Sequence, residues 1–231
     1  MTPGARIAAA IDCLDAIAKE VRPADAVLES YFRKRRYAGS KDRKAVQARV
    51  YDVLRRRARL DWWCARTGAT PSDSSRVENR SRLIADLALS DKETPTGISA
   101  LFSGNRHCPP PLSSYEMDLA QALAGRPLSH HSDMPDAVRL EYPEWLDAGL
   151  RSVFGPDLEP EMIALNQQAP VDLRTNTVKA TWEEANASLE AALVEFEPTS
   201  LSPLGFRLSG HARLGGLPAY RDGLVEIQGH L

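Results

Sequence analysis

Positively charged side chains are crowded into one short segment, and their type and spacing suggest a binding chemistry. Eight cations fall between positions 33 and 49: Arg33, Lys34, Arg35, Arg36, Lys41, Arg43, Lys44 and Arg49. Phosphate binding needs many cations on one surface, because each neutralised phosphate releases counterions and the gains accumulate. The segment therefore predicts contact with a polyanion. The alternative, a solvated helix face that keeps the chain soluble, stays open at this point.

The distribution of charge along the chain favours the polyanion modestly. Residues 1–66 hold 16 Lys+Arg against 8 Asp+Glu, although the whole chain has a formal net charge of −2. A second basic cluster spans positions 55–59, where we expect some arginines to pair with acids such as Asp52 and Asp61. Lys41 and Lys44 are expected on the helix face opposite the apolar valines of the same segment.

Other residues that could do chemistry lack the partners that chemistry needs. Cys108 stands in a His-Cys-Pro loop without a neighbouring acid, and His130-His131 has no further ligand at metal-binding spacing. Trp62-Trp63 fits core and edge aromatics better than base-stacking residues. The glycine-containing stretch 210–216 is interpreted as a turn, since no phosphate-binding glycine motif occurs. We therefore expect no metal site and no nucleotide cradle.

The three cysteines and the hydropathy indicate the cellular compartment of the chain. Cys13, Cys64 and Cys108 are odd in number and widely spaced, which indicates free thiols and a reducing cytoplasm. No run of about 18 apolar residues occurs, so no membrane-spanning helix is expected.

Apolar spacing predicts a first, all-helical region. Helices are expected over residues 5–20, around 27–33, from 40 to about 57, around 83–89 and around 98–102. Ser113 and Glu116 form a capping-box pattern that opens another helix to about Ala124. The polar stretch 125–135 is the expected interdomain linker.

The pattern changes after residue 135. A helix is expected over 144–154, with Trp145, Leu146, Leu150 and Val153 facing inward and Gly155 ending it. Strands are expected at 171–176, 193–196, 206–208 and 224–228, and a capping box at Thr181 opens a helix to about residue 192. This order predicts a small α+β domain of a ferredoxin-like or RNA-recognition-like kind.

Four stretches also match a known family in their order. They are Gly39–Arg56 with Leu60-Asp61-Trp62, Tyr142-Pro143-Glu144-Trp145-Leu146, Asn166–Asn176 and Leu217–Gln228. Together they resemble the Sun/Fmu (RsmB-like) family of 16S ribosomal-RNA cytosine-5 methyltransferases. The resemblance implies a mostly α fold, with a NusB-like helical RNA-binding bundle over 1–135 and a small α+β, RNA-recognition-like domain over 136–231.

The resemblance also implies further RNA contacts and a missing chemistry. Arg174, Asn176 and Lys179 are candidate RNA contacts, with a strand-end hydrogen-bond network as the alternative. In the family, a catalytic domain follows the last stretch and supplies S-adenosylmethionine binding and two catalytic cysteines. Here only Gly229-His230-Leu231 follow. We therefore expect no catalytic residue and no cofactor in this chain, which alone should be inactive.

The functional expectation is the RNA-binding, substrate-targeting portion of a ribosomal-RNA methyltransferase in the cytoplasm. Its partner would be RNA, ribosomal in kind, with neither DNA nor a membrane involved. The alternative is a NusB-like module that contacts protein or RNA in transcription antitermination or ribosome assembly. A functionless remnant of an interrupted gene is a third reading.

Overall fold

The computed structural model describes residues 1–67, 78–209 and 214–228. It consists of two compact units, Met1–Asn166 and Gln167–Leu231, each described here on its own. Residues 68–77, the first part of the predicted 210–216 turn and the last three residues lie outside the described residues. The contact boundary at Asn166 lies later along the chain than the boundary expected at residue 135.

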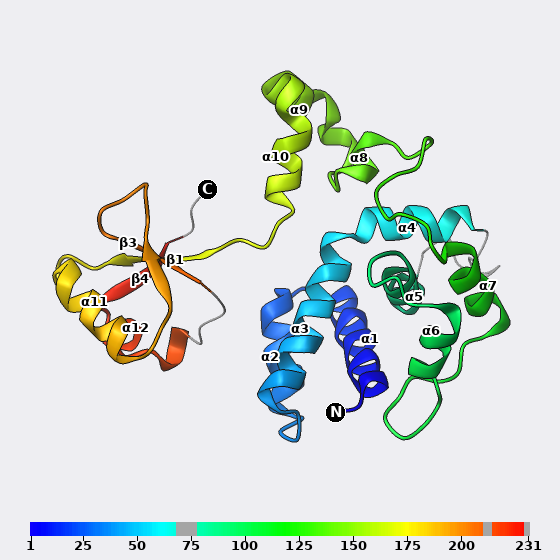
Figure 1. The fold of residues 1–231 in the computed structure, drawn as a ribbon, viewed down its shortest axis with the longest axis horizontal. Coiled ribbons are helices and arrows are strands. Elements are labelled where there is room, and N and C mark those ends of the chain that lie inside the picture. Colours follow the sequence, from blue (N-terminus) through cyan, green and yellow to red (C-terminus); the bar gives the residue numbers. More distant parts are fainter. Residues whose placement is uncertain (68–77, 210–213, 229–231) are drawn as a thin grey trace. The chain divides into compact units, whose positions relative to one another are not determined.

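The first unit is helical (Figure 1). Its described α-helices are α1 (Pro3–Lys19), α2 (Ala24–Arg33), α3 (Ser40–Arg55), α4 (Arg57–Arg66), α5 (Asn79–Leu89), α6 (Pro95–Leu101), α7 (Ser114–Leu123), α8 (Asp136–Arg139), α9 (Asp147–Phe154) and α10 (Leu158–Leu165). Five of these follow the predicted apolar spacing. The expected third helix corresponds to α3, which ends at Arg55. Arg56, with a φ of −105° and a ψ of 15°, separates it from α4, which was not predicted.

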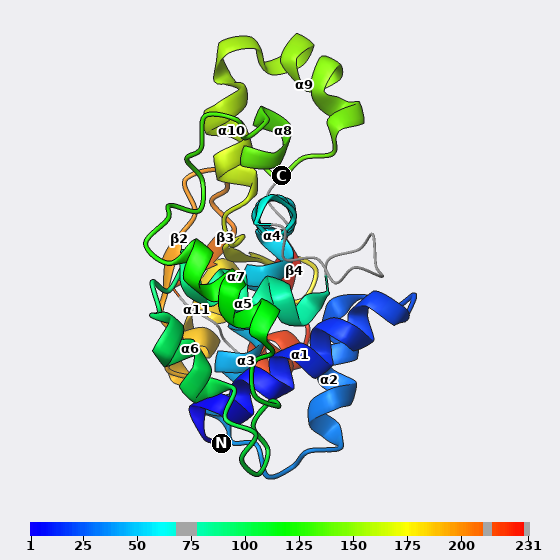
Figure 2. The ribbon, with the colours of Figure 1, turned by 90° about the vertical axis from the view of Figure 1, so that its right-hand side faces the viewer.

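Helix α5 forms the centre of this unit. It contacts α1, α3, α4, α6 and α7, and every residue from Ser81 to Leu89 is buried (Figures 1 and 2). A helix that is buried all round must satisfy its charged side chains inside the protein. Arg82 and Asp86 are such side chains, at 4% and 0% exposure. Arg82 makes a two-bond contact with Asp61 of α4.

Residues 125–135 belong to the helical unit and do not form the expected interdomain linker. The carbonyl of Leu128 accepts a hydrogen bond from Trp63 Nε1 at 3.0 Å, and Ser129 accepts one from Arg59. His131 packs on the rings of Trp62 and Trp63, and Met134 is buried in the core. These contacts were not visible in the polar composition of the stretch.

The following segment, α8 to α10, has a small core of its own, formed by Ala137, Leu140, Tyr142, Leu158 and Met162. The predicted inward orientation of the 144–154 helix is partly wrong. Leu150 and Phe154 pack against this core, but Trp145 and Val153 are 80% and 75% exposed. Gly155 ends the helix as predicted, with a φ of +52°.

Glu141 connects this segment to α4. Its carboxylate accepts the backbone N–H groups of Ala58 and Arg59 at 2.8 and 3.0 Å, and Arg59 Nε at 2.7 Å. These backbone donors lie in the first turn of α4, where no residue earlier in the helix can accept them. Glu141 therefore caps α4 from 82 residues away in sequence.

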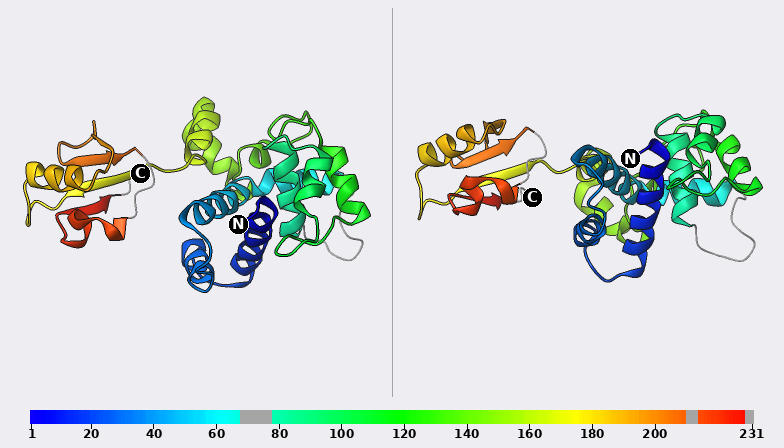
Figure 3. Two further views of the ribbon diagram at one scale, coloured as in Figure 1. Left: turned by 60° about the horizontal axis from the view of Figure 1, so that its bottom comes forward. Right: turned by 90° about the horizontal axis from the view of Figure 1, so that it is seen from below.

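The second unit is a four-stranded antiparallel sheet with two helices, α11 (Trp182–Ala191) and α12 (Pro218–Arg221) (Figure 3). Its strands are β1 (Val171–Thr175), β2 (Phe196–Pro198), β3 (Gly205–Leu208) and β4 (Val225–Gln228), in the order β2-β3-β1-β4. Leu173, Phe206 and Val225 share one core with Ala185 and Ala219 of the helices. Both helices thus cover the same face of the sheet.

The predicted strand at 193–196 begins too early. Leu193 has a φ of +54° and is 92% exposed, and Val194 donates its N–H to the carbonyl of Leu189. These residues close the end of α11, so that pairing with β3 begins only at Phe196.

The capping boxes at Ser113 and Thr181 are confirmed. Among the described helices, none is long and apolar enough to cross a membrane.

Glu141→Ala is expected to destabilise the helical unit by about 3 kcal/mol, because it leaves Arg59 and two first-turn N–H groups without their acceptor. The substitution keeps the strain of the positive φ at this position, 61° in the structure, since alanine also has a Cβ. Urea unfolding measures the loss. Glu144→Ala, which changes an exposed carboxylate nearby, is the control. Equal unfolding midpoints for the two variants would contradict the capping role.

Candidate nucleic-acid interface

Five of the predicted cations form an exposed group where α2 ends and α3 begins. Ala38 is buried and anchors the connection between the helices, with its N–H donated to the carbonyl of Arg35 at 3.0 Å. We call this group the α2–α3 basic surface; it comprises Arg33, Lys34, Arg36, Lys41 and Lys44. Within the part of the chain that the structure describes, none of the five makes an ion pair or a side-chain hydrogen bond.

Two further predicted cations lie beside this surface but have protein partners. Arg35 lies over the ring of Tyr31, 3.6 Å from its centroid, and 3.7 Å from a carboxylate oxygen of Asp12. Arg43 Nε donates to the carbonyl of Ala38 at 2.9 Å. The buried residues Val46, Val50 and Val53 confirm the expectation that Lys41 and Lys44 occupy the opposite, exposed face of α3.

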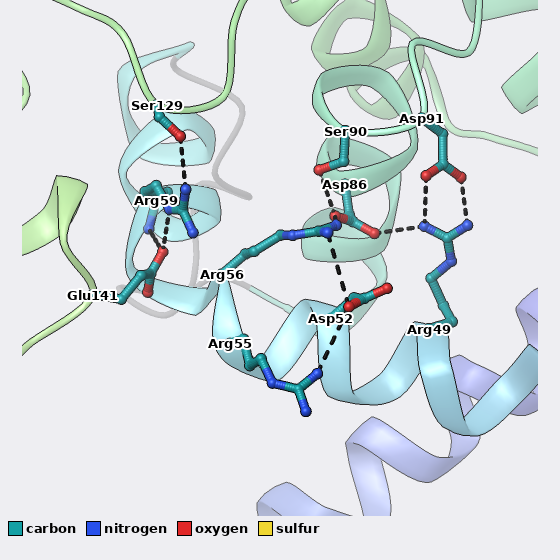
Figure 4. A network of polar contacts seen from close by, with 10 residues as sticks. All are labelled: Arg49, Asp52, Arg55, Arg56, Arg59, Asp86, Ser90, Asp91, Ser129 and Glu141. Atoms are coloured by element: carbon teal, nitrogen blue, oxygen red, sulfur yellow. Dashed lines mark hydrogen bonds and ion pairs between the residues drawn. The ribbon is translucent and has the colours of Figure 1, made fainter. Parts of the chain in front are cut away.

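Arg49 is placed elsewhere, which revises the predicted set. Its guanidinium binds Asp86 of the central helix, with Nη1 2.6 Å from Oδ2, and it also pairs with Asp91 (Figure 4). Burial disfavours the charged guanidinium, but the hydrogen bonds to Asp91 and the charge of Asp86 hold the pKa of Arg49 above its ordinary value. Arg49 is therefore occupied by the protein itself.

The second basic cluster is also occupied largely by acids, as predicted for Asp52 and Asp61. Arg56 reaches the other oxygen of Asp86 at 2.8 Å, and Arg55 lies 3.8 Å from Asp52 (Figure 4). Arg57 lies 3.7 Å from Asp61. Burial raises the pKa of Glu141, the partner of Arg59, while the hydrogen bonds from Arg59 and Ala58 act against this rise. This cluster holds helices together.

In the second unit, the candidates Asn176 and Lys179 fasten the turn before β4. Asn176 Nδ2 donates to the carbonyl of Gly223 at 3.1 Å, and Lys179 Nζ donates to the carbonyl of Asp222 at 3.3 Å. Arg174 pairs across the sheet with Glu226 at 3.1 Å. The geometry is the strand-end network that the sequence left open as the alternative to RNA contact.

The sheet face opposite the helices offers no aromatic platform among the described strand residues. Phe196 and Phe206 both lie on the covered face, where Phe206 stacks on Trp182. On the other face, Arg207 binds Asp172 through two hydrogen bonds of 2.8 Å. Recognition domains of this fold stack bases on exposed strand aromatics. The cations on this face are instead paired within the sheet.

The cysteine and histidine candidates are dispersed. Cys13 and Cys64 are buried in the helical core, and Cys108 is partly exposed. Burial, with a smaller effect of a nearby aspartate, raises the pKa of each buried thiol to about 12. Across residues 1–67, 78–209 and 214–228, no three His, Cys, Asp or Glu side chains come together in a way that could hold a metal ion.

Comparison with protein families gives one match. Residues 142–214 match the family described as the Methyltr_RsmF/B-like, ferredoxin-like domain. The match confirms the resemblance for these residues, and the strand order of the second unit agrees with a ferredoxin-like arrangement. No curated protein sequence matches the chain.

Among solved structures, the crystal structure of PH0851 is similar over 99% of this chain, with a TM-score of 0.64 and 19% sequence identity. At this identity, the likeness establishes a shared fold. The aligned region is 53% of that protein, so the present chain spans about half the length of the solved structure it matches.

Asp86→Ala is expected to lower the free energy of unfolding by about 3 kcal/mol, because it removes the buried carboxylate that Arg49 and Arg56 share and leaves them only their second acids, Asp91 and Asp52. Chemical denaturation followed by circular dichroism measures this loss. Asp118→Ala removes an exposed carboxylate from α7 and is expected to stay within about 0.5 kcal/mol of the native chain. If Asp86→Ala changed the free energy of unfolding as little as Asp118→Ala, the ion pair with Asp86 would not explain the position of the Arg49 side chain.

Proposed function

We propose, from the RsmF/B-like ferredoxin-like domain that residues 142–214 carry, that this chain is the RNA-binding portion of an S-adenosylmethionine-dependent ribosomal-RNA cytosine-5 methyltransferase. In this proposal the helical unit is a NusB-like domain that positions the RNA substrate. The observation that carries the proposal is the α2–α3 basic surface, whose five cations are exposed and have no acidic partner among the described residues.

The surface is suited to phosphates because its charges are not neutralised by the protein. An unpaired ammonium or guanidinium group on an exposed surface can displace the counterions of a phosphate backbone, whereas a paired one must first lose its partner. The cations at positions 49 and 55–59 are already paired with acids of the protein. RNA binding is therefore assigned to the connection between α2 and α3.

The N-terminus of α3 adds to this positive field. Its N-cap, Gly39, supplies no side-chain hydrogen bond, and Lys41 and Lys44 stand in the first turns of the helix. Cations at a helix N-terminus cost local stability but strengthen the attraction of an anion there. The one acid of this turn, Asp42, is already engaged by Arg6 at 2.9 Å and by the amino group of Met1. These hydrogen bonds hold the pKa of Asp42 below its ordinary value.

The methyl-transfer chemistry is assigned to a domain other than these two units. The described residues do not fit S-adenosylmethionine: the loop from β1 to α11, residues 176–181, contains no glycine, whereas nucleotide-type cofactors are cradled by glycine-rich strand-to-helix loops. The raised pKa values keep Cys13 and Cys64 protonated, and only a thiolate is nucleophilic. The chain alone would bind RNA and leave cytosine unmodified.

RNA binding is tested by fluorescence anisotropy with a ribosomal-RNA hairpin over a range of salt concentrations. The triple variant Arg36→Glu, Lys41→Glu, Lys44→Glu is expected to lose affinity and to reduce the slope of log affinity against log salt by about two to three. The loss follows from the removal of phosphate contacts.

The matched control is Lys19→Glu, Arg22→Glu, Lys92→Glu, which makes the same change in net charge at exposed positions outside the surface. It is expected to bind nearly as the native chain does. Equal losses in the two triple variants would show a nonspecific charge effect and would remove the proposed interface. Absence of any RNA binding would favour the protein-interaction module.

A second test concerns the cofactor. Isothermal titration calorimetry of the chain with S-adenosylmethionine is expected to show no binding heat, because the loop from β1 to α11 lacks a glycine-rich cradle. A full-length RsmF/B-like methyltransferase serves as the positive control. Micromolar binding to the present chain would contradict the assignment of cofactor chemistry to another domain.

A further inference from the structure

A cleft of about 730 Å³ opens in the helical unit beside the α2–α3 basic surface. Its floor is the apolar side of α1, with Ala5, Ala8 and Ile11. One wall comes from α2 and the connection after it, and the other from the loop around residues 106–110. Volumes of this size are typical of sites for small organic ligands.

The loop wall is held closely against α1. A Cβ at Gly4 would lie 2.6 Å from the carbonyl oxygen of Leu101 and 2.7 Å from Cys108 Sγ, so only glycine permits this approach. The loop itself is closed by a hydrogen bond of 2.8 Å from the N–H of Cys108 to the carbonyl of Asn105. The cleft is therefore bounded by packed backbone on this side.

The polar lining is basic and aromatic. Its charged residues are Arg35, Arg80 and Arg106 with one acid, Asp12. Arg80 is bound to Glu116 and Arg35 lies near Asp12, whereas Arg106 is exposed and has no ion pair with a described residue.

Two tyrosines of the lining differ in their contacts. Tyr31 is fixed by a hydrogen bond of 3.0 Å to Asp12. Tyr37 is 69% exposed, although it borders an apolar floor, and its hydroxyl makes no hydrogen bond to a described residue. An exposed ring at the mouth of a cleft with an alanine floor offers a flat surface on which a planar group can stack.

The cleft and the basic surface share one segment of chain. In the run from Arg33 to Tyr37, the residues Arg33, Lys34 and Arg36 belong to the surface, whereas Arg35 and Tyr37 line the cleft. A strand whose phosphates lie on the surface would carry its next nucleotide past the mouth of the cleft. Unpaired RNA bases are recognised by aromatic stacking together with arginine.

We propose that this cleft binds one unpaired nucleotide of the RNA, with its base stacked on Tyr37 over the floor of α1 and its phosphate near Arg106. The inference rests on the proposed RNA-binding function and adds a preference for RNA with unpaired nucleotides.

Binding of a single-stranded oligoribonucleotide and of a blunt duplex of the same length tests the inference. Tyr37→Ala and Arg106→Gln are each expected to weaken single-strand binding by about tenfold and to leave duplex binding unchanged, since only an unpaired nucleotide that enters the cleft makes the stacking contact with Tyr37 and the phosphate contact with Arg106. Trp145→Ala and Lys19→Gln, which alter an exposed aromatic and an exposed cation outside the cleft, are the controls.

The two hypotheses fail in different ways. If the triple charge reversal on the α2–α3 basic surface weakens both RNAs while the cleft variants change neither, the cleft inference is overturned and the proposed function stands. If neither RNA binds the native chain, both are overturned. Equal weakening of single strand and duplex by the cleft variants would show only a phosphate contact and would also overturn the nucleotide site.

A thiol at the cleft supplies an independent readout. Cys108 lines the cleft and is partly exposed, whereas Cys13 and Cys64 are buried and serve as internal controls. Saturating single-stranded RNA is expected to slow alkylation of Cys108 by iodoacetamide several-fold, as mapped by mass spectrometry, and the duplex is expected to have no such effect. An unchanged rate with bound single strand would contradict occupancy of the cleft.

Discussion

The burial of a charged helix is the constraint on which the helical unit depends. Helix α5 lies at the centre of the unit, and its Asp86 is completely buried. A buried carboxylate is tolerated only with cationic and hydrogen-bonding partners, which Arg49, Arg56 and Ser90 provide. These contacts connect α3, the residue between α3 and α4, and α5. The pairing of the buried Asp86 carboxylate therefore fixes the positions of these elements relative to one another.

This constraint also divides the basic residues into two populations. The cations near the acids of α5 and α4 form ion pairs that pack the helices, whereas the five cations of the α2–α3 basic surface have no ion pair with a described acid. Along the sequence the two groups are adjacent and look alike. Their different surroundings separate a structural role from a binding role, and the small net charge of −2 hides the difference.

Local patterns predicted much of the fold. Apolar spacing located five of the described helices of the first unit, and the two capping boxes fixed the starts of α7 and α11. Two predictions failed: Leu193 turns the chain at the end of α11 where a strand was expected, and nothing described covers Trp145, which was expected to face inward. For the site, the exposed cations were predictable, but the occupation of Arg49 was not. That Tyr37 and Arg106 line one cleft depends on the tertiary fold, because neither residue carries a recognisable local motif.

The family match and the compact units divide the chain at different positions, and Glu141 lies just before the first of these. The family match begins at Tyr142 and extends into the sheet, yet by contact the chain up to Asn166 belongs with the helices. Glu141, one residue before the match, provides the hydrogen-bond acceptor for the first turn of α4. The segment shared among relatives and the segment that folds together therefore overlap rather than coincide. If evolution exchanged the chain from Tyr142 onward, α9 and α10 would be exchanged together with the sheet. The resulting protein would still need the Glu141 carboxylate, because it caps α4.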